Sequence, residues 1–213
     1  MTDTRKRKLD RVDFLGDCVL AFKNSVHTDV IVKSAGDGPG IPAHKTILAA
    51  KSKVFSYMLD SDECKTSVEK SITIPDLSYE ELKALLEFFY SGILSPTNKH
   101  IRALYVAADK YDIPYLQELC RDHFKSTTTL SNVLDILEMS TIHSDNLLKD
   151  WATFFVLTHM EEIVNSSGYR LFVQQNPDQG LYITQAFVKS LKSQLGSKLN
   201  QLLRVAFLSK PQV

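Results

Sequence analysis

Residues 41–55, IPAHKTILAAKSKVF, decide the fold more than any other stretch of this chain. A short apolar arm leads into His44, and the spacing of the apolar residues after it predicts a helix over 45–51. A second short helix is predicted over 52–59. An extended arm followed at once by two short helices indicates mixed α and β structure.

Residues 28–33, TDVIVK, lie upstream and are rich in β-branched side chains, which predicts a strand. The GDGPG run over 36–40 predicts the turn of a hairpin whose return arm begins at Ile41. This run lacks the spacing of the glycine-rich phosphate loops, and a strand arm rather than a helix follows it. We therefore expect a turn here and no phosphate site.

Downstream, an alternating segment predicts a strand over 71–74, closed by Pro75. Ser78 and Glu81 have the spacing of a capping box, and the helix that they begin is expected to end at Gly92. Further helices are predicted over 98–110 and from Pro114. The side chains expected to point inward are Leu82, Leu85, Leu86, Phe89, Ile101, Leu104, Tyr105, Ala108, Leu116, Leu119, Cys120 and Phe124.

From Ser131 onward the pattern is wholly helical, with turns expected over 166–168 and 176–180. A helix capped at Ser144 is expected to carry one apolar stripe, and another helix is expected over 181–208, interrupted or kinked at Gly196. The apolar stripes of these segments are Val133, Leu134 and Leu137, then Leu147, Leu148, Trp151, Phe154 and Phe155, and finally Phe187, Leu191, Leu195, Leu199, Leu202 and Leu203.

Composition excludes wholesale disorder, because 44% of the 213 residues are hydrophobic and 23% are charged. The formal net charge is zero but unevenly placed: residues 1–11 carry +3, residues 179–213 carry +5 with no acid, and the remainder carries −8. An acidic centre argues against a core that binds nucleic acid. The basic ends are solvated tails or contacts for an acidic partner.

Three widely spaced cysteines, Cys18, Cys64 and Cys120, indicate reduced thiols and hence a cytoplasmic and/or nuclear protein. The N-terminal residues have no apolar segment of a secretory signal, and no uncharged apolar run approaches the roughly 18 residues that a membrane span needs. We therefore expect no contact with a membrane.

Several motifs together resemble the BTB/POZ family. Asp29–Val30 and the segment Ala43 to Phe55 match its strand and its A-H-K-x-x-L-A-x-x-S-x-x-F pattern. Residues 88–92, FFYSG, and 107–111, AADKY, are similar to two later motifs of the family in the same order. The resemblance covers 12–125 and is specific as an ordered set.

The resemblance implies an α+β fold, a small β-sheet capped by a helical cluster, with Asp29, His44, Lys45 and Gly92 in structural roles. Residues 126–170 resemble the 3-box or BACK-like helical extension of plant-type adaptors of cullin-3 ubiquitin ligases. We expect a disordered basic N-terminus over 1–11 and a basic amphipathic helical tail over 171–213, which either packs on the body or binds a partner.

The apolar residues of the predicted helix over 12–24 form either core or a dimer interface. Because they cannot all face one domain, the pattern favours the dimer interface. The resemblance implies a homodimer through this helix. The interface residues that we predict are Val12, Phe14, Leu15, Cys18, Val19 and Phe22.

The resemblance also implies a surface for the N-terminal domain of cullin-3, formed by the end of the helix at 53–59 and the turn near 111–115. We predict that it comprises Tyr57, Met58, Leu59, Asp60, Asp62, Cys64, Tyr111, Ile113 and Tyr115. Exposed tyrosine and methionine beside acids are typical of binding hot spots. Adaptors often carry a glutamate where this chain has Thr66, which weakens the expected contact.

No nucleophile–base pair and no metal set is recognisable, so we expect no enzyme activity, no cofactor and no metal. Cys120 and His123 share a helix face but have no second pair of ligands. Two functions stay open: an adaptor that presents an unknown protein substrate to cullin-3, and an oligomerisation scaffold that does not bind cullin. The 3-box-like extension over 126–170 favours the adaptor; Thr66 favours the scaffold.

Overall fold

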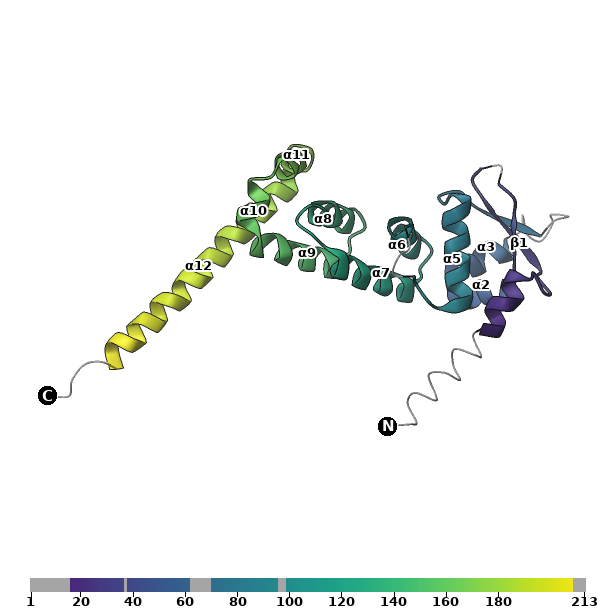
Figure 1. The fold of residues 1–213 in the computed structure, drawn as a ribbon, viewed down its shortest axis with the longest axis horizontal. Helices are drawn as coiled ribbons and strands as arrows, with labels where there is room; N and C mark the ends of the chain where they lie inside the picture. Colours follow the sequence, from purple (N-terminus) through teal and green to yellow (C-terminus); the bar gives the residue numbers. More distant parts are fainter. Residues whose placement is uncertain (1–15, 37, 62–69, 96–98, 209–213) are drawn as a thin grey trace. The chain divides into compact units, whose positions relative to one another are not determined.

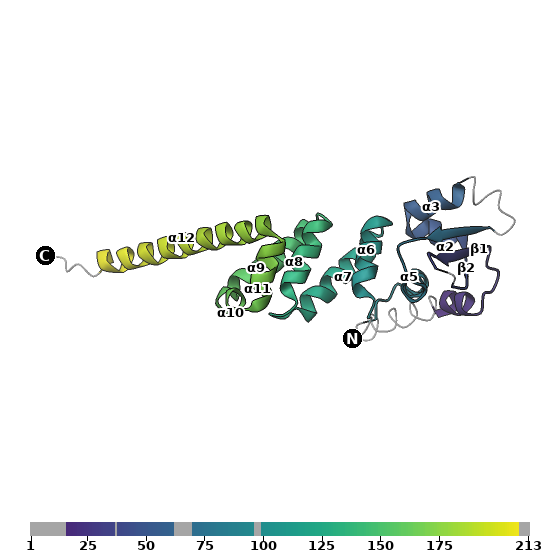
Figure 2. The same ribbon diagram turned by 90° about the horizontal axis from the view of Figure 1, so that it is seen from above.

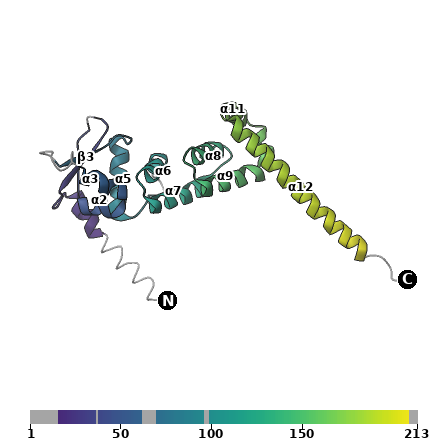
Figure 3. The ribbon, with the colours of Figure 1, turned by 180° about the vertical axis from the view of Figure 1, so that it is seen from behind.

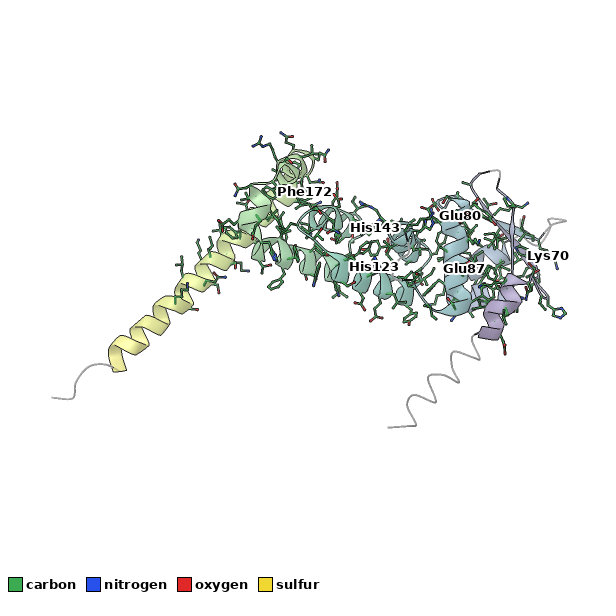
Figure 4. All side chains as sticks on the ribbon, in the orientation of Figure 1. Lys70, Glu80, Glu87, His123, His143 and Phe172 are labelled. Carbon is green, nitrogen blue, oxygen red and sulfur yellow. The ribbon has the colours of Figure 1, made fainter. Side chains whose placement is uncertain are left out.

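The computed structural model describes residues 16–36, 38–61, 70–95 and 99–208, with side chains described as far as residue 198. The chain divides into two compact units, and the first ends at His123, inside one helix (Figures 1 and 4). Each unit is described by itself below.

The first unit holds a three-stranded sheet in the order β2-β1-β3. Strand β1 (Val30–Ser34) pairs antiparallel with β2 (Ile41–Ala43) and parallel with β3 (Ser71–Ile74). The hairpin predicted around the GDGPG run therefore forms, with Val32 opposite Ile41. Alternate residues of β1 are buried, as expected for a strand with one face on the core.

Helices surround this sheet in the order that the sequence predicts. A first helix is described over 16–23, followed by α2 (Lys45–Lys51), α3 (Lys53–Asp60), α5 (Tyr79–Ser91) and α6 (Ile101–Lys110). Figure 2 shows α2, α3 and α5 beside the strands. The capping box forms at Ser78, and Glu80 and Glu81 place negative charge in the first turn of α5, where the helix dipole favours it (Figure 4).

The second unit is entirely helical over its described residues. Helix α7 (Pro114–Thr127) crosses the boundary between the units, and five helices follow it. They are α8 (Val133–Ile142), α9 (Asn146–Thr158), α10 (Met160–Val164), α11 (Ser167–Gln175) and α12 (Pro177–Leu208). Phe172 of α11 is buried within this unit (Figure 4).

Two details of α9 differ from the sequence prediction. Asp145, not Ser144, caps the helix, because its carboxylate accepts a hydrogen bond from the Leu148 backbone N–H at 3.2 Å. Leu147 and Phe154 belong to the predicted apolar stripe but are 67% and 66% exposed. The buried face is instead formed by Leu148, Ala152, Thr153 and Val156.

The turns predicted in the second unit contain the breaks between helices but are shorter than expected, because helix begins at Ser167 and at Pro177. Ser166 caps α11 through a hydrogen bond from Tyr169, and Pro177 begins α12, so 176–180 is a helix start. Gly180 lies where a Cβ atom would approach Val173 to 3.0 Å, so glycine permits α11 and α12 to pack closely. Helix α12 continues through Gly196 without interruption.

Candidate functional site

His44 is the centre of a polar cluster between the sheet and α5. Its backbone N–H donates to the Tyr90 hydroxyl at 2.8 Å, and its ring Nδ1 lies 2.8 Å from the same oxygen. Its Nε2 lies 2.7 Å from the Val26 carbonyl oxygen, which can only accept. The proton of the neutral ring is therefore on Nε2, and the Tyr90 hydroxyl donates to Nδ1.

Asp29 and Lys45 belong to the same neighbourhood. A carboxylate oxygen of Asp29 accepts from the Lys45 backbone N–H at 2.8 Å, so Asp29 satisfies an amide in the first turn of α2. These hydrogen bonds connect the end of β2, the start of α2 and α5.

Gly92 has a different role, at the end of the helix that carries Tyr90. It adopts a left-handed backbone conformation with φ of 64°, and its N–H donates to the Phe88 carbonyl at 2.7 Å. A side chain would be strained at this φ, which explains why glycine ends α5.

The predicted dimer helix is described only from residue 16. Val12, Phe14 and Leu15 lie outside the described residues. Phe22 is buried and stacks on Tyr90 with ring centroids 4.4 Å apart, whereas Cys18 and Val19 are partly exposed. Leu20 is 56% exposed. One face of the helix therefore packs on its own domain through Phe22, and apolar residues on another side remain accessible.

The predicted cullin surface divides into exposed and buried residues. Tyr57 is 76% and Tyr115 58% exposed, Met58 is partly buried and Asp60 is exposed. Asp62 and Cys64 lie outside the described residues. Leu59, Tyr111 and Ile113 are buried in the core, at 6%, 3% and 3% exposure, so they offer little surface for the predicted contact. Of the three, Leu59 reaches the surface where it lines the groove described below.

Tyr111 instead packs in the core beneath the segments that carry the exposed Tyr57 and Tyr115. Its ring lies 5.3 Å from that of Phe55 on α3, and its carbonyl oxygen accepts a hydrogen bond from the Ser52 hydroxyl at the start of α3. The turn after α6 is thereby attached to α3. Beyond that turn, Tyr115 stacks on Phe88 of α5, with centroids 6.1 Å apart.

Asp76 is a partner of this turn that sequence analysis missed. Its carboxylate accepts from the Lys110 ammonium and, at 2.7 Å, from the Tyr111 hydroxyl. These hydrogen bonds, that from Lys110 first, lower the pKa of Asp76, while burial and then Asp76 raise the pKa of Tyr111. The sequence motif that contains Lys110 and Tyr111 indicates two of the three residues in this hydrogen-bonded group, but no motif indicates Asp76.

A shallow groove lies beside the exposed end of α3. Lys45, Thr46 and Ala49 of α2 form one wall, and Ser56, Leu59 and Asp60 of α3 form the other, around a volume of about 320 Å³. Sequence analysis did not identify this groove, because its walls come from the packing angle of two short helices.

The described residues contain no group of three His, Cys, Asp or Glu side chains placed to hold a metal ion. Cys120 is fully buried, and burial raises the pKa of its thiol to about 12, so it behaves as a core residue. Among the described helices, none combines the length and the apolar character that crossing a bilayer requires.

Comparison with known proteins places these features in a family. Residues 20–128 match the BTB/POZ domain. The chain is 54% identical over 190 residues to the BTB/POZ domain-containing protein At1g01640 of Arabidopsis thaliana, covering 88% of this chain and 92% of that protein. It is 42% identical to At3g56230 of the same plant, over 91% of this chain and 69% of that one.

Among solved structures, the BTB domain of zebrafish PATZ1 is 23% identical, with a TM-score of 0.44, and covers 55% of this chain and 93% of that domain. One conclusion follows from the described sheet and helices together with the match over 20–128. This chain belongs to the BTB/POZ family, whose domains mediate protein–protein interaction.

Proposed function

We propose that this chain is an adaptor of a cullin-3 RING ubiquitin ligase in the cytoplasm or nucleus. One surface of its BTB/POZ domain binds the N-terminal domain of cullin-3, and the helical second unit holds the protein to be ubiquitinated. The first helix joins two copies into a dimer.

The observation that carries this proposal is the exposure of two tyrosines, Tyr57 on α3 and Tyr115 on α7, in the two segments predicted to meet the cullin. Tyrosine is enriched at binding hot spots because its large rigid ring loses little conformational entropy on binding. Both segments rest on Tyr111, Phe55 and Phe88, so little ordering is needed when a partner binds.

One sequence feature favours a second function, an oligomerisation scaffold without cullin binding. Thr66 stands where many adaptors have a glutamate, and a missing charge at such a contact costs affinity. The scaffold and the adaptor share the fold and the dimer and differ only at the cullin surface.

Titration of the purified chain with the N-terminal domain of cullin-3, by calorimetry and light scattering, separates the two. The adaptor predicts a dissociation constant of about 1 μM or lower and a two-to-two complex. A stable dimer that does not bind cullin would identify the scaffold.

The surface itself is tested with Tyr57→Ala combined with Met58→Ala, which should abolish cullin binding and leave the dimer intact. Ile93→Ala is the matched control, because it truncates a 65% exposed apolar side chain elsewhere on the domain. Binding that survives the double substitution would show that the cullin surface lies elsewhere.

A further inference from the structure

Helix α12 has an apolar stripe that nothing in the described part of the second unit covers. Leu181, Val188 and Leu195 recur every seven residues and are 57%, 44% and 66% exposed. Turning about 100° per residue, they lie within about 40° of one another around the helix and about 140° from Ile183. Ile183 is fully buried, so the stripe faces away from the side that packs on the unit.

The helix also extends well beyond its own packing. It contacts α9 and α11 near its start, and Figures 1 and 3 show it continuing past the other helices of its unit. Its 32 residues span about 48 Å. Helices gain most of their stability from tertiary packing of an apolar face, so a long unpacked segment with such a face needs a partner.

With Leu191, which is 42% exposed, the stripe spans about 80° around the helix, and this width distinguishes between kinds of partner. A repeat of seven residues is the seam of a helix pair, whereas a helix lying on a membrane has a broad apolar face. Here polar side chains, Thr184 and Gln185, stand immediately beside Val188 and line a shallow hollow with it. The pattern therefore favours another helix over a lipid surface.

Charge distinguishes further. Lys189, Lys192 and Lys198 are exposed and lie on both sides of the stripe, and no acid occurs from residue 179 to the end of the chain. A second copy of α12 would bring these lysines against their own equivalents, which opposes pairing. A helix with acidic residues beside its apolar positions would pack on the apolar stripe and form ion pairs with the flanking lysines.

We propose that the exposed stripe of α12, with its flanking lysines, binds an acidic amphipathic helix of another protein. This deepens the proposed function by giving the chemical class of the captured protein, and it rests on that function only in calling that protein a substrate.

The test measures fluorescence anisotropy of two labelled peptides of about 28 residues titrated with the full chain. Both carry leucine at the a and d positions of four heptads; one has glutamate and the other lysine at the e and g positions. The glutamate peptide should bind at least about tenfold more tightly than the lysine peptide, and raising the salt concentration should weaken it. Equal binding of the two peptides would overturn the proposal.

The position of the site is tested with Val188→Asp combined with Leu195→Asp, which should weaken binding of the glutamate peptide at least about tenfold. The matched control is Ser193→Asp with Ser197→Asp, two exposed positions that lie on the side of the helix away from the stripe. It adds the same charge and should change binding by less than about threefold. Unchanged binding in the stripe variant, or equal losses in both variants, would overturn the proposal.

A third variant, Lys189→Gln with Lys192→Gln, preserves the stripe and should reduce the preference for the glutamate peptide. Circular dichroism of each variant establishes that the helix content is retained. Two measurements test the other possible occupants of the stripe. Light scattering of the wild type and the stripe variant tests for a second copy of the chain. Sedimentation with vesicles of phosphatidylserine and phosphatidylcholine tests for a lipid surface. Self-association that is lost in the stripe variant would show that the stripe binds a second copy of the chain. Vesicle binding without peptide binding would show that it binds a lipid surface. Either result would overturn the acidic helix as the occupant.

The peptide-binding test can be read separately from the test of cullin binding. The stripe variant should bind the N-terminal domain of cullin-3 as the wild type does. Peptide binding without cullin binding would reject only the adaptor, and cullin binding without peptide binding would reject only this surface.

Discussion

His44 and Tyr90 are joined by two hydrogen bonds that share one oxygen atom. The Tyr90 hydroxyl accepts from the His44 backbone N–H and donates to its Nδ1, both at 2.8 Å, although 46 residues separate the two in sequence. The same ring of Tyr90 stacks on Phe22 of the first helix. One side chain thus connects β2 and α2 to α5 and to the helix predicted to form the dimer.

Tyr90→Phe should therefore destabilise the domain without removing any apolar contact. The substitution leaves the His44 N–H and Nδ1 without their partner. Such a loss costs about 1–3 kcal/mol for fully buried groups, so about 1 kcal/mol is expected at this partly buried site. The free energy of unfolding from urea denaturation measures the effect. Tyr57→Phe, at an exposed site, is the control and should change stability by less than about 0.5 kcal/mol. Equal effects of the two substitutions would mean that the shared hydroxyl contributes nothing.

Asp76 should make stability depend on pH in acid. Because hydrogen bonds from Lys110 and Tyr111 lower its pKa below 3.8, its contribution is present above that value and is lost as the pH falls through the lowered pKa. Asp76→Asn should thus cost up to about 1 kcal/mol at pH 7, since the pair with Lys110 is partly exposed.

Urea denaturation of both proteins from pH 7 to pH 2 checks this expectation. The difference between wild type and variant should shrink once the pH falls below about 4. Glu87→Gln, which removes an exposed carboxylate of α5, serves as the control. A difference for Asp76→Asn that is the same at pH 7 and pH 2 would contradict a role for the ionised carboxylate.

The first helix should carry the dimer. Val19→Asp places a charge among the accessible apolar residues of the helix, where a partner copy would have to desolvate it, so the protein should become monomeric or insoluble. Light scattering measures the mass. Asn24→Asp adds the same charge in the exposed turn after the helix and should leave the dimer unchanged. A soluble native dimer carrying Val19→Asp would place the interface elsewhere.

Local patterns alone were sufficient to place several elements of the first unit. The β-branched run before the GDGPG turn predicted β1, the Ser78–Glu81 spacing predicted the start of α5, and Gly92 predicted its end. The two ends of α5 depend on interactions between residues only a few positions apart, and the β-branched composition of β1 is itself a local feature. Such interactions do not change with the surroundings, which is why sequence analysis placed these elements correctly.

The second unit shows where local patterns fail. Asn176, Pro177 and Gly180 are typical turn residues, yet Pro177 also suits the first position of a helix, and Gly180 allows Val173 of α11 to approach. Gly196 costs a helix only about 1 kcal/mol relative to alanine, and the helix-forming residues around it outweigh that cost. In α9, apolar residues occupy two faces, and the packing against neighbouring helices, α8 above all, decides that Leu148 is buried while Phe154 is exposed.

The sequence by itself determined the family, the element order and the candidate polar residues Asp29, His44 and Lys45, because ordered motifs identify them. The tertiary structure decided that Tyr90, 46 residues from His44, joins them. Only the tertiary structure decided which members of the predicted cullin surface are accessible. Tyr111 and Tyr115 lie four residues apart in one motif-rich segment, but Phe55 and Asp76 hold the first in the core, while the second stacks on Phe88 and still faces solvent. Exposure depends on partners from distant parts of the chain, and no local pattern contains them.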